Sequence, residues 1–304
     1  MNQKFLLVIG GPTAVGKTRC SIQLARHFSC PILSADSRQV YKEMHIGTAK
    51  PSKEELSQAD HFLIGHKSII DNYSVGAYLR DAERILNQLF KEHDLVIAVG
   101  GTGLYLKALT EGIDEFPEVT KETKEELQSI YESEGLTALQ EMIKNRDPQY
   151  AHKVDLNNPH RLIRALSVIL TTGQTFSSFL QQSKNELRYK SILISFQLPR
   201  EVLYERINKR VDDMMNSGLL EEAQQLFDKR ALPSLNTVGY KELFDYLKGD
   251  CELNYAIDKI KQHTRNYAKR QITWFKNQQA YHPFAPYEIE SVISFVEEQI
   301  NPKE

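Results

Sequence analysis

Short apolar runs alternate with amphipathic stretches over the first 110 residues of the chain. The runs "KFLLVIGG", "CPILSADS" and "DLVIAVGG" are each continuous and end in glycines or polar residues, as buried parallel strands do. Between them, "TRCSIQLARHF" and "VGAYLRDAERILNQLFKEH" place apolar residues at the spacing of one helical face. This alternation of strand and helix predicts a parallel sheet with right-handed crossovers.

The pattern changes near Ile113. The following stretches, "EVTKETKEELQSIYESEGLTALQEMIKNRDP" and "NNPHRLIRALSVILTTGQTFSSFL", are charged and helical and contain no buried strand. One more strand, "KSILISFQLPR", comes next, and after Pro199 the pattern predicts only helices, ending in a long amphipathic one. We therefore expect an α/β core formed by residues 1–112 and 189–304, with a helical C-terminal part, and an all-helical insertion over residues 113–188.

Composition narrows the class of protein. The chain has 304 residues, 41% of them hydrophobic, and a net charge of −2, as an ordinary globular protein has, so any nucleic-acid contact would depend on a local basic patch. The three cysteines, Cys20, Cys30 and Cys251, form no metal-binding spacing and suit a reducing compartment. No apolar run reaches the ~18 residues of a membrane span. We expect a cytoplasmic monomer without membrane association.

A glycine-rich motif follows the first predicted strand. The sequence "GPTAVGKT" matches G-x-x-x-x-G-K-[ST] and lies between a predicted strand and a predicted helix, which is the context that a phosphate-binding loop requires. Backbone N–H groups would line an anion nest, Lys17 would add charge, and the Thr18 hydroxyl would ligate Mg²⁺. The predicted phosphate-binding residues are Gly11, Pro12, Thr13, Ala14, Val15, Gly16, Lys17 and Thr18.

ATP is the first candidate for that phosphate, but the other strands do not complete a hydrolase. Nucleotide hydrolases hold the metal with a carboxylate at the end of a second strand, whereas "LVIAV" ends in Gly100, Gly101 and Thr102. No N-K-x-D run for guanine is present. The loop is therefore expected to hold a diphosphate that leaves, although a small-molecule kinase could place its carboxylate elsewhere. Asp36, at the end of the second strand, is either a metal ligand or a base that takes a proton from the acceptor.

Six motifs together point to one family. In order, "GPTAVGKT", "ADSRQVYKEMHIGTAKP", "VGGTGLYLKALTEG", "NPHRLIRAL", "VGYKE" and "AKRQITWFK" resemble those of the bacterial tRNA dimethylallyltransferases. The resemblance runs from about Lys4 to Asn277, and six ordered motifs are far more specific than the glycine-rich loop alone. One departure is Val15, which replaces a small polar residue inside the loop.

The resemblance implies a fold and a reaction. It implies a P-loop NTPase-like parallel sheet flanked by helices, with a helical insertion. The implied reaction transfers the dimethylallyl group from dimethylallyl diphosphate to N6 of the adenosine just 3′ of the anticodon in tRNA. Asp36 matches the general base of the family, and Thr102 matches a residue that orients the acceptor amine. Asp36, Ser37, Arg38 and Gln39 match a segment that contacts the target adenosine and its neighbours.

Further tRNA contacts are implied in three places. The residues that match them are Lys124, the helical run His160, Arg161, Leu162, Ile163 and Arg164, and the run Asn236, Thr237, Val238, Gly239, Tyr240 and Lys241. In addition, the last long helix carries basic side chains at helical spacing, and we expect Arg265 and Arg270 to contact tRNA phosphates.

Other functions stay open on the sequence alone. A nucleotide or metabolite kinase would use the same loop for ATP, with "RINKRVDDMM" as a mobile lid. An adenylate isopentenyltransferase would act on free AMP or ADP, although a free nucleotide needs no long helical insertion. A nucleotide-dependent switch or RNA-binding module is disfavoured because the guanine motif and the strand-end acid are missing.

Overall fold

The computed structural model describes residues 3–114, 116–180, 187–278 and 280–301. Contacts divide the chain into two compact units. One, the core unit, consists of Met1–Glu111 and Leu187–Glu304; the other, the helical unit, is Gly112–Glu186.

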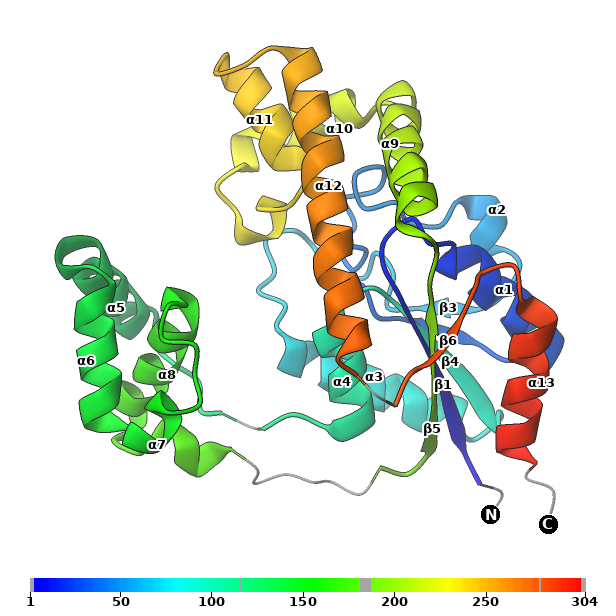
Figure 1. Ribbon diagram of the computed structural model, residues 1–304, viewed down its shortest axis with the longest axis horizontal. Helices are drawn as coiled ribbons and strands as arrows, with labels where there is room; N and C mark the ends of the chain where they lie inside the picture. Colours follow the sequence, from blue (N-terminus) through cyan, green and yellow to red (C-terminus); the bar gives the residue numbers. More distant parts are fainter. Residues whose placement is uncertain (1–2, 115, 181–186, 279, 302–304) are drawn as a thin grey trace. The chain divides into compact units, whose positions relative to one another are not determined.

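The centre of the core unit is a six-stranded sheet with the order β3-β2-β4-β1-β5-β6 (Figure 1). All of its pairings are parallel, as the sequence predicts. The carboxyl ends of the strands meet at one edge, so the loops after β1, β2 and β4 lie beside one another. The strands are β1 (Phe5–Gly10), β2 (Ile32–Ser34), β3 (His61–Phe62), β4 (Leu95–Val99), β5 (Lys190–Phe196) and β6 (His282–Phe284).

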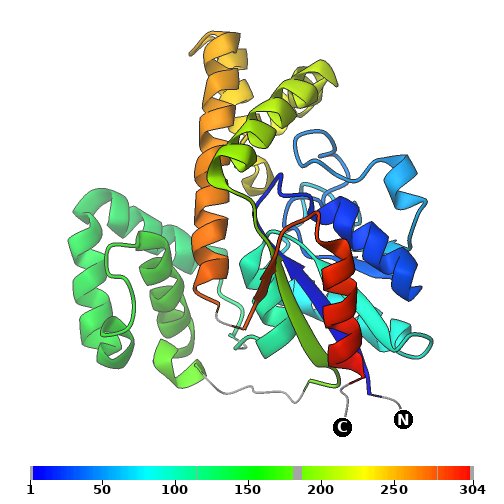
Figure 2. The ribbon, with the colours of Figure 1, turned by 45° about the vertical axis from the view of Figure 1, so that its right-hand side comes forward.

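Helices cover both faces of this sheet (Figure 2). On one face, alternate residues of β1 such as Leu7 and Ile9 pack with α1 and α13. On the other, Leu6 and Val8 share a core with α3 and α4. Coverage of both faces explains the continuous apolar runs in the sequence. These helices are α1 (Lys17–Phe28), α3 (Val75–Leu89), α4 (Gly103–Glu111) and α13 (Ile289–Ile300).

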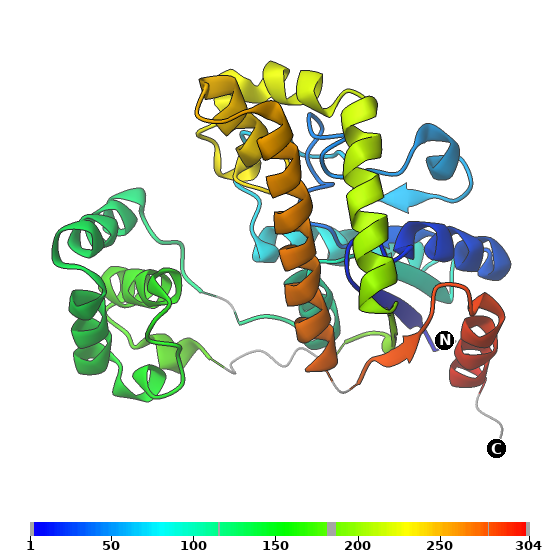
Figure 3. The same cartoon turned by 45° about the horizontal axis from the view of Figure 1, so that its top comes forward.

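A third hydrophobic cluster lies beyond the carboxyl edge of the sheet. It joins Val40 and Met44, from the segment after β2, to α9, α10, α11 and α12. Figure 3 shows α9 and α12 running side by side in this region. The elements here are α2 (Lys53–Leu56), α9 (Arg200–Asn216), α10 (Leu219–Leu226), α11 (Tyr240–Lys248) and α12 (Leu253–Lys276), with short 3₁₀ turns at Phe227–Lys229 and Pro233–Leu235.

The helical unit has its own core, which Leu127, Leu139, Leu162 and Leu166 help to form. A buried carboxylate braces it: Asp147 accepts hydrogen bonds from the backbone N–H of Tyr150 (3.0 Å) and the backbone N–H of Ser177 (2.7 Å). The elements are α5 (Lys121–Glu134), α6 (Leu136–Arg146), α7 (Pro148–Ala151), α8 (Pro159–Thr172) and a 3₁₀ turn at Phe176–Phe179.

The prediction of helices alone after Pro199 is wrong at His282–Phe284, which form β6. This strand has three residues, lies at the edge of the sheet and contains Pro283, so it carries almost none of the hydrophobic alternation that marks a strand. Within the described part of the chain, no helix combines the length and the apolar character needed to cross a bilayer.

Candidate active site

The loop between β1 and α1 has the backbone shape of a phosphate cradle. Three of its residues have positive φ: Gly11 (139°), Ala14 (63°) and Gly16 (113°). A Cβ at Gly11 would lie 2.7 Å from the carbonyl oxygen of Phe196, so only glycine fits there. The loop leads into the first turn of α1, which carries Thr18, and the helix start adds its positive end to the cradle. We call residues 11–18 the donor loop.

Lys17 lies folded back over the donor loop. Its Nζ donates hydrogen bonds to the carbonyl oxygens of Gly11 (2.9 Å) and Pro12 (2.8 Å). Burial lowers the pKa of Lys17 to about 8; the charge of Asp36 opposes that shift, and the charge of Arg210 adds to it. A buried ammonium with a second cation beside it is poorly stabilised, so an incoming anion would gain strongly from both charges.

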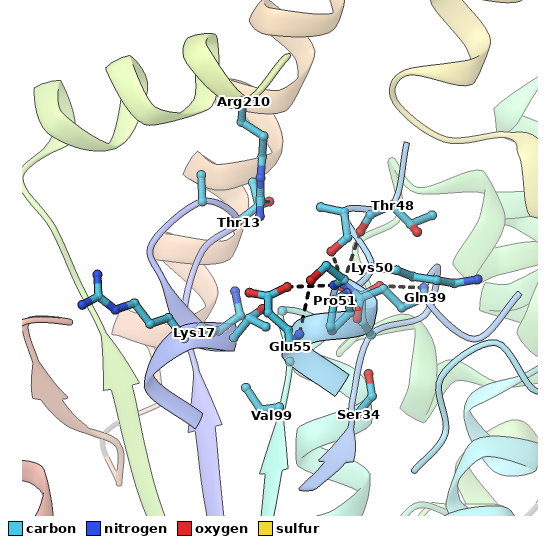
Figure 4. A pocket seen from close by; sticks show the side chains of 18 of the residues that line it. Thr13, Lys17, Ser34, Gln39, Thr48, Lys50, Pro51, Glu55, Val99 and Arg210 are labelled. Atoms are coloured by element: carbon cyan, nitrogen blue, oxygen red, sulfur yellow. Dashed lines mark hydrogen bonds between the residues drawn. The ribbon is translucent and has the colours of Figure 1, made fainter. Parts of the chain in front are cut away.

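The donor loop opens into a cavity of about 880 Å³ within the core unit. Its walls come from the donor loop, the segment from Asp36 to Glu55, the glycines after β4, and the helices α9 and α12. In Figure 4, Arg210 and Thr13 lie on one side of the cavity, and Gln39, Thr48 and Lys50 lie on the opposite side. Since these walls start from three adjacent strand ends, the cavity occupies the edge where α/β sheets bind ligands.

Two arginines of α9 reach the donor loop. The Nη1 atom of Arg206 donates to the carbonyl oxygen of Val15 (3.1 Å), and Nη1 of Arg210 donates to Oγ1 of Thr13 (3.2 Å). They are four residues apart, so both lie on the helix face directed at the loop. The sequence singled out this stretch only as the lid of a kinase, and the structure instead makes it a cationic wall of the cavity.

Gln271 joins α12 to two of the strand ends, and the sequence analysis missed it. Its Oε1 accepts a hydrogen bond from the backbone N–H of Thr13 (2.8 Å), and its Nε2 donates to the carbonyl oxygen of Gly101 (2.8 Å). The contact requires a glycine, because a Cβ at Gly101 would lie 2.3 Å from Nε2 of Gln271. A single glutamine in a helical pattern gives no signal of this role, since its partners lie far away in the sequence.

The segment Asp36–Gln39, which we call the acceptor loop, is fixed by hydrogen bonds. Oδ1 of Asp36 accepts from the backbone N–H groups of Arg38 (2.8 Å) and Gln39 (3.3 Å). Oγ1 of Thr102 accepts from the backbone N–H of Ser37 (3.0 Å) and donates to its Oγ (3.2 Å). Asp36 and Thr102, which the sequence paired only by resemblance, therefore lie at neighbouring strand ends and are joined through Ser37.

The other two side chains of the acceptor loop bind backbone carbonyls. Nη1 of Arg38 donates to the carbonyl oxygen of Ser234 (2.9 Å), just before the predicted tRNA segment at Asn236. Nε2 of Gln39 donates to the carbonyl oxygens of Thr48 (3.2 Å) and Ala49 (3.0 Å). The loop is thus held in one conformation from both sides.

The carboxylate of Glu222 organises the next stretch of the cavity wall. It accepts hydrogen bonds of 2.9 Å from the backbone N–H groups of His45, Ile46 and Gly47. It also accepts one of 2.6 Å from the hydroxyl of Tyr240, whose pKa is raised far above its ordinary value by burial and by this carboxylate. The Tyr240 side chain is fully buried against Gly47 and faces protein, so we assign it to packing.

The remaining residues of the Asn236–Lys241 segment differ in exposure. Asn236 and Lys241 are exposed, and Thr237 and Val238 are half-buried. Gly239 is buried with a φ of 100°, and its N–H donates to Oε2 of Glu242 (2.8 Å). The side chains of this segment that are open to a partner are therefore at its two ends.

In the helical unit, the predicted tRNA-binding cations are at the surface. His160, Arg161 and Arg164 on α8 are exposed, and so is Lys124 on α5. Ile163 is half-buried, whereas Leu162 is fully buried in the core of the unit and contributes packing. The guanidinium of Arg164 lies 5.3 Å from the ring centre of Phe116, which holds it at the surface of this core.

The basic residues of α12 have partners in the protein. Nη1 of Arg265 donates to Oδ1 of Asn208 (2.6 Å), and Lys261 forms an ion pair with Asp212 (2.6 Å), so both face α9. Arg270 is exposed and lies over the ring of Tyr267, with 5.7 Å to the centroid. Of the two predicted phosphate contacts, Arg270 is the more open to solvent.

The oxygen ligands beside the donor loop suit a hard divalent cation that is bound mainly through substrate phosphate. Thr18 and Asp36 both line the cavity and present oxygen atoms. In the described residues no cluster of three or more His, Cys, Asp or Glu side chains forms a complete metal cage. Mg²⁺ needs no such cage, because it usually takes one or two protein ligands together with water and substrate phosphates.

Comparison with known proteins adds independent information. A family model described as IPP transferase matches residues 39–278. A tRNA dimethylallyltransferase of Christiangramia forsetii is 52% identical over 272 residues, which cover 90% of this chain and 90% of that protein. One of Flavobacterium johnsoniae is 49% identical over 279 residues, again covering 90% of both chains.

Solved structures agree with these matches. The tRNA isopentenylpyrophosphate transferase of Bacillus halodurans superposes with a TM-score of 0.73 at 36% identity, covering 98% of this chain and 97% of that chain. A eukaryotic dimethylallyltransferase acting on tRNA superposes with a TM-score of 0.84 at 25% identity, covering 99% of this chain and 80% of that chain. With a P-loop-type fold and a family model that matches most of its length, the chain belongs to the IPP transferase family.

Proposed function

We propose that the protein transfers a dimethylallyl group from dimethylallyl diphosphate to N6 of the adenosine 3′-adjacent to the anticodon in tRNA. The observation that carries this proposal is one cavity that contains both a cationic diphosphate cradle and the carboxylate of Asp36. The names of the relatives, which are tRNA dimethylallyltransferases, support the choice of donor and acceptor.

The donor loop binds the diphosphate of the donor in this proposal. Backbone N–H groups of Ala14, Gly16, Lys17 and Thr18 bind the phosphates, and Lys17 exchanges its two carbonyl partners for phosphate oxygens. Arg206 and Arg210 bring two more positive charges from α9. These cations stabilise negative charge where it grows as the allylic C–O bond breaks, and such stabilisation is usually the largest contribution to catalysis.

The proposal includes Mg²⁺, bound together with the diphosphate of the donor. The Thr18 hydroxyl would hold it against the diphosphate, and Asp36 is near enough to the cavity to orient its water shell. When bound, it supplies further neutralisation of the leaving diphosphate.

Asp36 acts as the base for the acceptor amine. The N6–C bond forms as the C–O bond breaks, diphosphate leaves with the electron pair of that bond, and one N6 proton passes to the Asp36 carboxylate. Both backbone hydrogen bonds to this carboxylate go to Oδ1, so Oδ2 is the oxygen that accepts the proton. Thr102 orients the amine while its Oγ1 fixes the position of Ser37.

The acceptor is bound as RNA and not as a free nucleotide. The target base must leave its stack to reach a cavity at the carboxyl edge of the sheet. Gln39 lines that cavity together with Asp36, and Ser37 and Arg38 lie between these two residues in the chain. Lys124, His160, Arg161 and Arg164 provide exposed cationic or polar groups for the phosphate backbone. Asn236, Lys241 and Arg270 offer similar groups in the core unit.

One experiment tests the proposal directly. Purified protein is incubated with Mg²⁺, radiolabelled dimethylallyl diphosphate and an unmodified anticodon stem-loop, and the label in RNA is measured. The matched control is the same stem-loop with purine riboside, which lacks the N6 amine, in place of the target adenosine. Label that depends on the amine supports the proposal. Parallel incubations replace the stem-loop with AMP, ADP or ATP. Label in free AMP or ADP but none in RNA, or a new phosphate ester formed from ATP, would overturn the proposal.

A further inference from the structure

An aromatic residue of α12 borders the cavity without a role in the binding of diphosphate or in proton transfer. Tyr267 lines the cavity together with Lys17, Thr18 and Asp36. Its side chain is large and apolar, yet the residue is 37% exposed. A large ring left open inside a substrate cavity is a surface for a ligand to cover.

Helix geometry places this ring on the reaction side of α12. Tyr267 is one helical turn before Gln271, so the two side chains share a face. Gln271 is fixed between the N–H of Thr13 and the carbonyl of Gly101. The face therefore starts at the donor loop, at Gln271, and continues along the cavity to Tyr267.

The ring also lies within electrostatic reach of the acceptor loop. Burial raises the pKa of Tyr267 to about 12; the charge of Asp36 adds to this rise, and those of Arg38 and Arg270 oppose it. The hydroxyl is therefore neutral at ordinary pH. The guanidinium carbon of Arg270 lies 5.7 Å from the centroid of the Tyr267 ring, and this contact helps to fix the orientation of the ring.

These positions leave one location for the prenyl group. The diphosphate is bound at Lys17, and the amine meets Asp36, so the allyl carbons must lie between the two. Tyr267 lines the same cavity as Lys17 and Asp36, and it does so from α12. Of the two α12 residues that line the cavity, Tyr267 and Gln271, it is the one with a large ring.

We infer that Tyr267 is a specificity-determining residue whose ring closes the prenyl end of the cavity and limits the donor to five carbons. The inference rests on the proposed function. The whole cavity of about 880 Å³ is much larger than a dimethylallyl group, so a side chain that narrows it beside the allylic carbon would set the length of the chain that fits. The same ring keeps water away from the allylic carbon, and its π-face stabilises the positive charge that develops there.

The test compares two donors in one enzyme. For wild type, Tyr267→Phe and Tyr267→Ala, kcat/KM is measured with dimethylallyl diphosphate and with geranyl diphosphate at saturating stem-loop RNA. A shorter side chain opens space for the second isoprene unit, so Tyr267→Ala is expected to raise the geranyl-to-dimethylallyl ratio about 10- to 100-fold. Tyr267→Phe keeps the ring and is expected to keep the wild-type ratio. A ratio within one enzyme is unaffected by partial unfolding or weaker RNA binding.

Tyr255 is the matched control. It is a tyrosine on the same helix, it is 55% exposed, and it borders a separate surface hollow with Lys259 and Arg265. Tyr255→Ala should leave the donor ratio at the wild-type value. An unchanged ratio in Tyr267→Ala, with wild type active on dimethylallyl diphosphate, overturns the inference alone. Absence of transfer by wild type would instead overturn the proposed function.

Discussion

Two regions that are proposed to meet RNA are built in opposite ways. The acceptor loop, Asp36–Gln39, is held by hydrogen bonds to its own backbone, to Thr102 and to distant carbonyls. The first two turns of α8 in the helical unit present His160, Arg161 and Arg164 to solvent from a helix whose other face is packed. One region is rigid and positions single atoms, whereas the other offers charge on long, adjustable side chains.

The difference indicates a division of work. A group that takes a proton must be held within hydrogen-bond reach of it, and preorganisation of that kind requires many fixed partners. A phosphate backbone is recognised by charge, which acts over several ångströms and tolerates side-chain motion. We therefore expect changes in the acceptor loop to lower kcat, and changes on α8 to lower RNA affinity.

The largest effect is expected from Asp36→Asn. The amide keeps the shape and one hydrogen-bond acceptor but cannot take the N6 proton, so kcat should fall about 10³-fold. RNA affinity, measured by fluorescence anisotropy with a labelled stem-loop, should stay within about threefold of wild type. A kcat near wild type would exclude Asp36 as the base, and a parallel loss of affinity would contradict the division of work.

Thr102→Val is expected to have a smaller effect of the same kind. Valine has nearly the same shape but leaves the backbone N–H of Ser37 without its acceptor, which costs about 1–3 kcal/mol in a half-buried place. We expect kcat to fall about 10- to 100-fold with little change in RNA affinity. Thr102→Ser, which keeps the hydroxyl, is the control and should retain most of the activity.

Tyr240→Phe tests a position where the family resemblance and the structure assign different roles. Loss of the hydroxyl removes a charge-assisted hydrogen bond to Glu222, so the free energy of unfolding should fall by about 1.5–3 kcal/mol in urea titrations. Because the side chain is buried, RNA affinity of the folded variant should equal that of wild type. A selective loss of RNA affinity at full stability would show that Tyr240 contacts RNA after all.

The smallest effect is expected from Arg161→Gln combined with Arg164→Gln. Two lost phosphate contacts should weaken RNA binding about three- to tenfold at moderate salt and lower the slope of log affinity against log salt by about 1–2. The rate at saturating RNA should not change. Lys144→Gln is a suitable control, since this lysine of the same unit is paired with Glu141 (2.8 Å). Equal salt slopes in the double variant and wild type would remove α8 from the interface.

The parts of the site that the sequence could predict are local ones. The donor loop needs only a strand, a glycine turn and a helix that are continuous in the chain, and Asp36 follows directly from a strand end. Gln271 and Arg210 could not be found this way, because they lie 258 and 197 residues from Thr13 in the sequence. Their positions depend on how α9 and α12 pack, and the helical pattern of the sequence does not indicate which face of each helix contacts the donor loop.

The sequence also did not predict the two short edge strands, β3 and β6. β3 has two residues and β6 has three, so both are too short to show a repeated hydrophobic alternation. The central strands β1, β4 and β5 were predictable because both of their faces are buried. The family resemblance added roles for Asp36 and Thr102, and the structure added the hydrogen bonds of Ser37 that join them.

The hydrogen bonds of Glu222 have a consequence for phosphate selectivity. Three successive backbone N–H groups, at His45, Ile46 and Gly47, converge on one carboxylate, which is the arrangement by which a loop captures an anion. The Glu222 carboxylate therefore occupies this second anion-binding nest. Because Glu222 already occupies these N–H groups, we expect the diphosphate of the donor to bind at the donor loop, beside Lys17, Arg206 and Arg210, and not at this second nest.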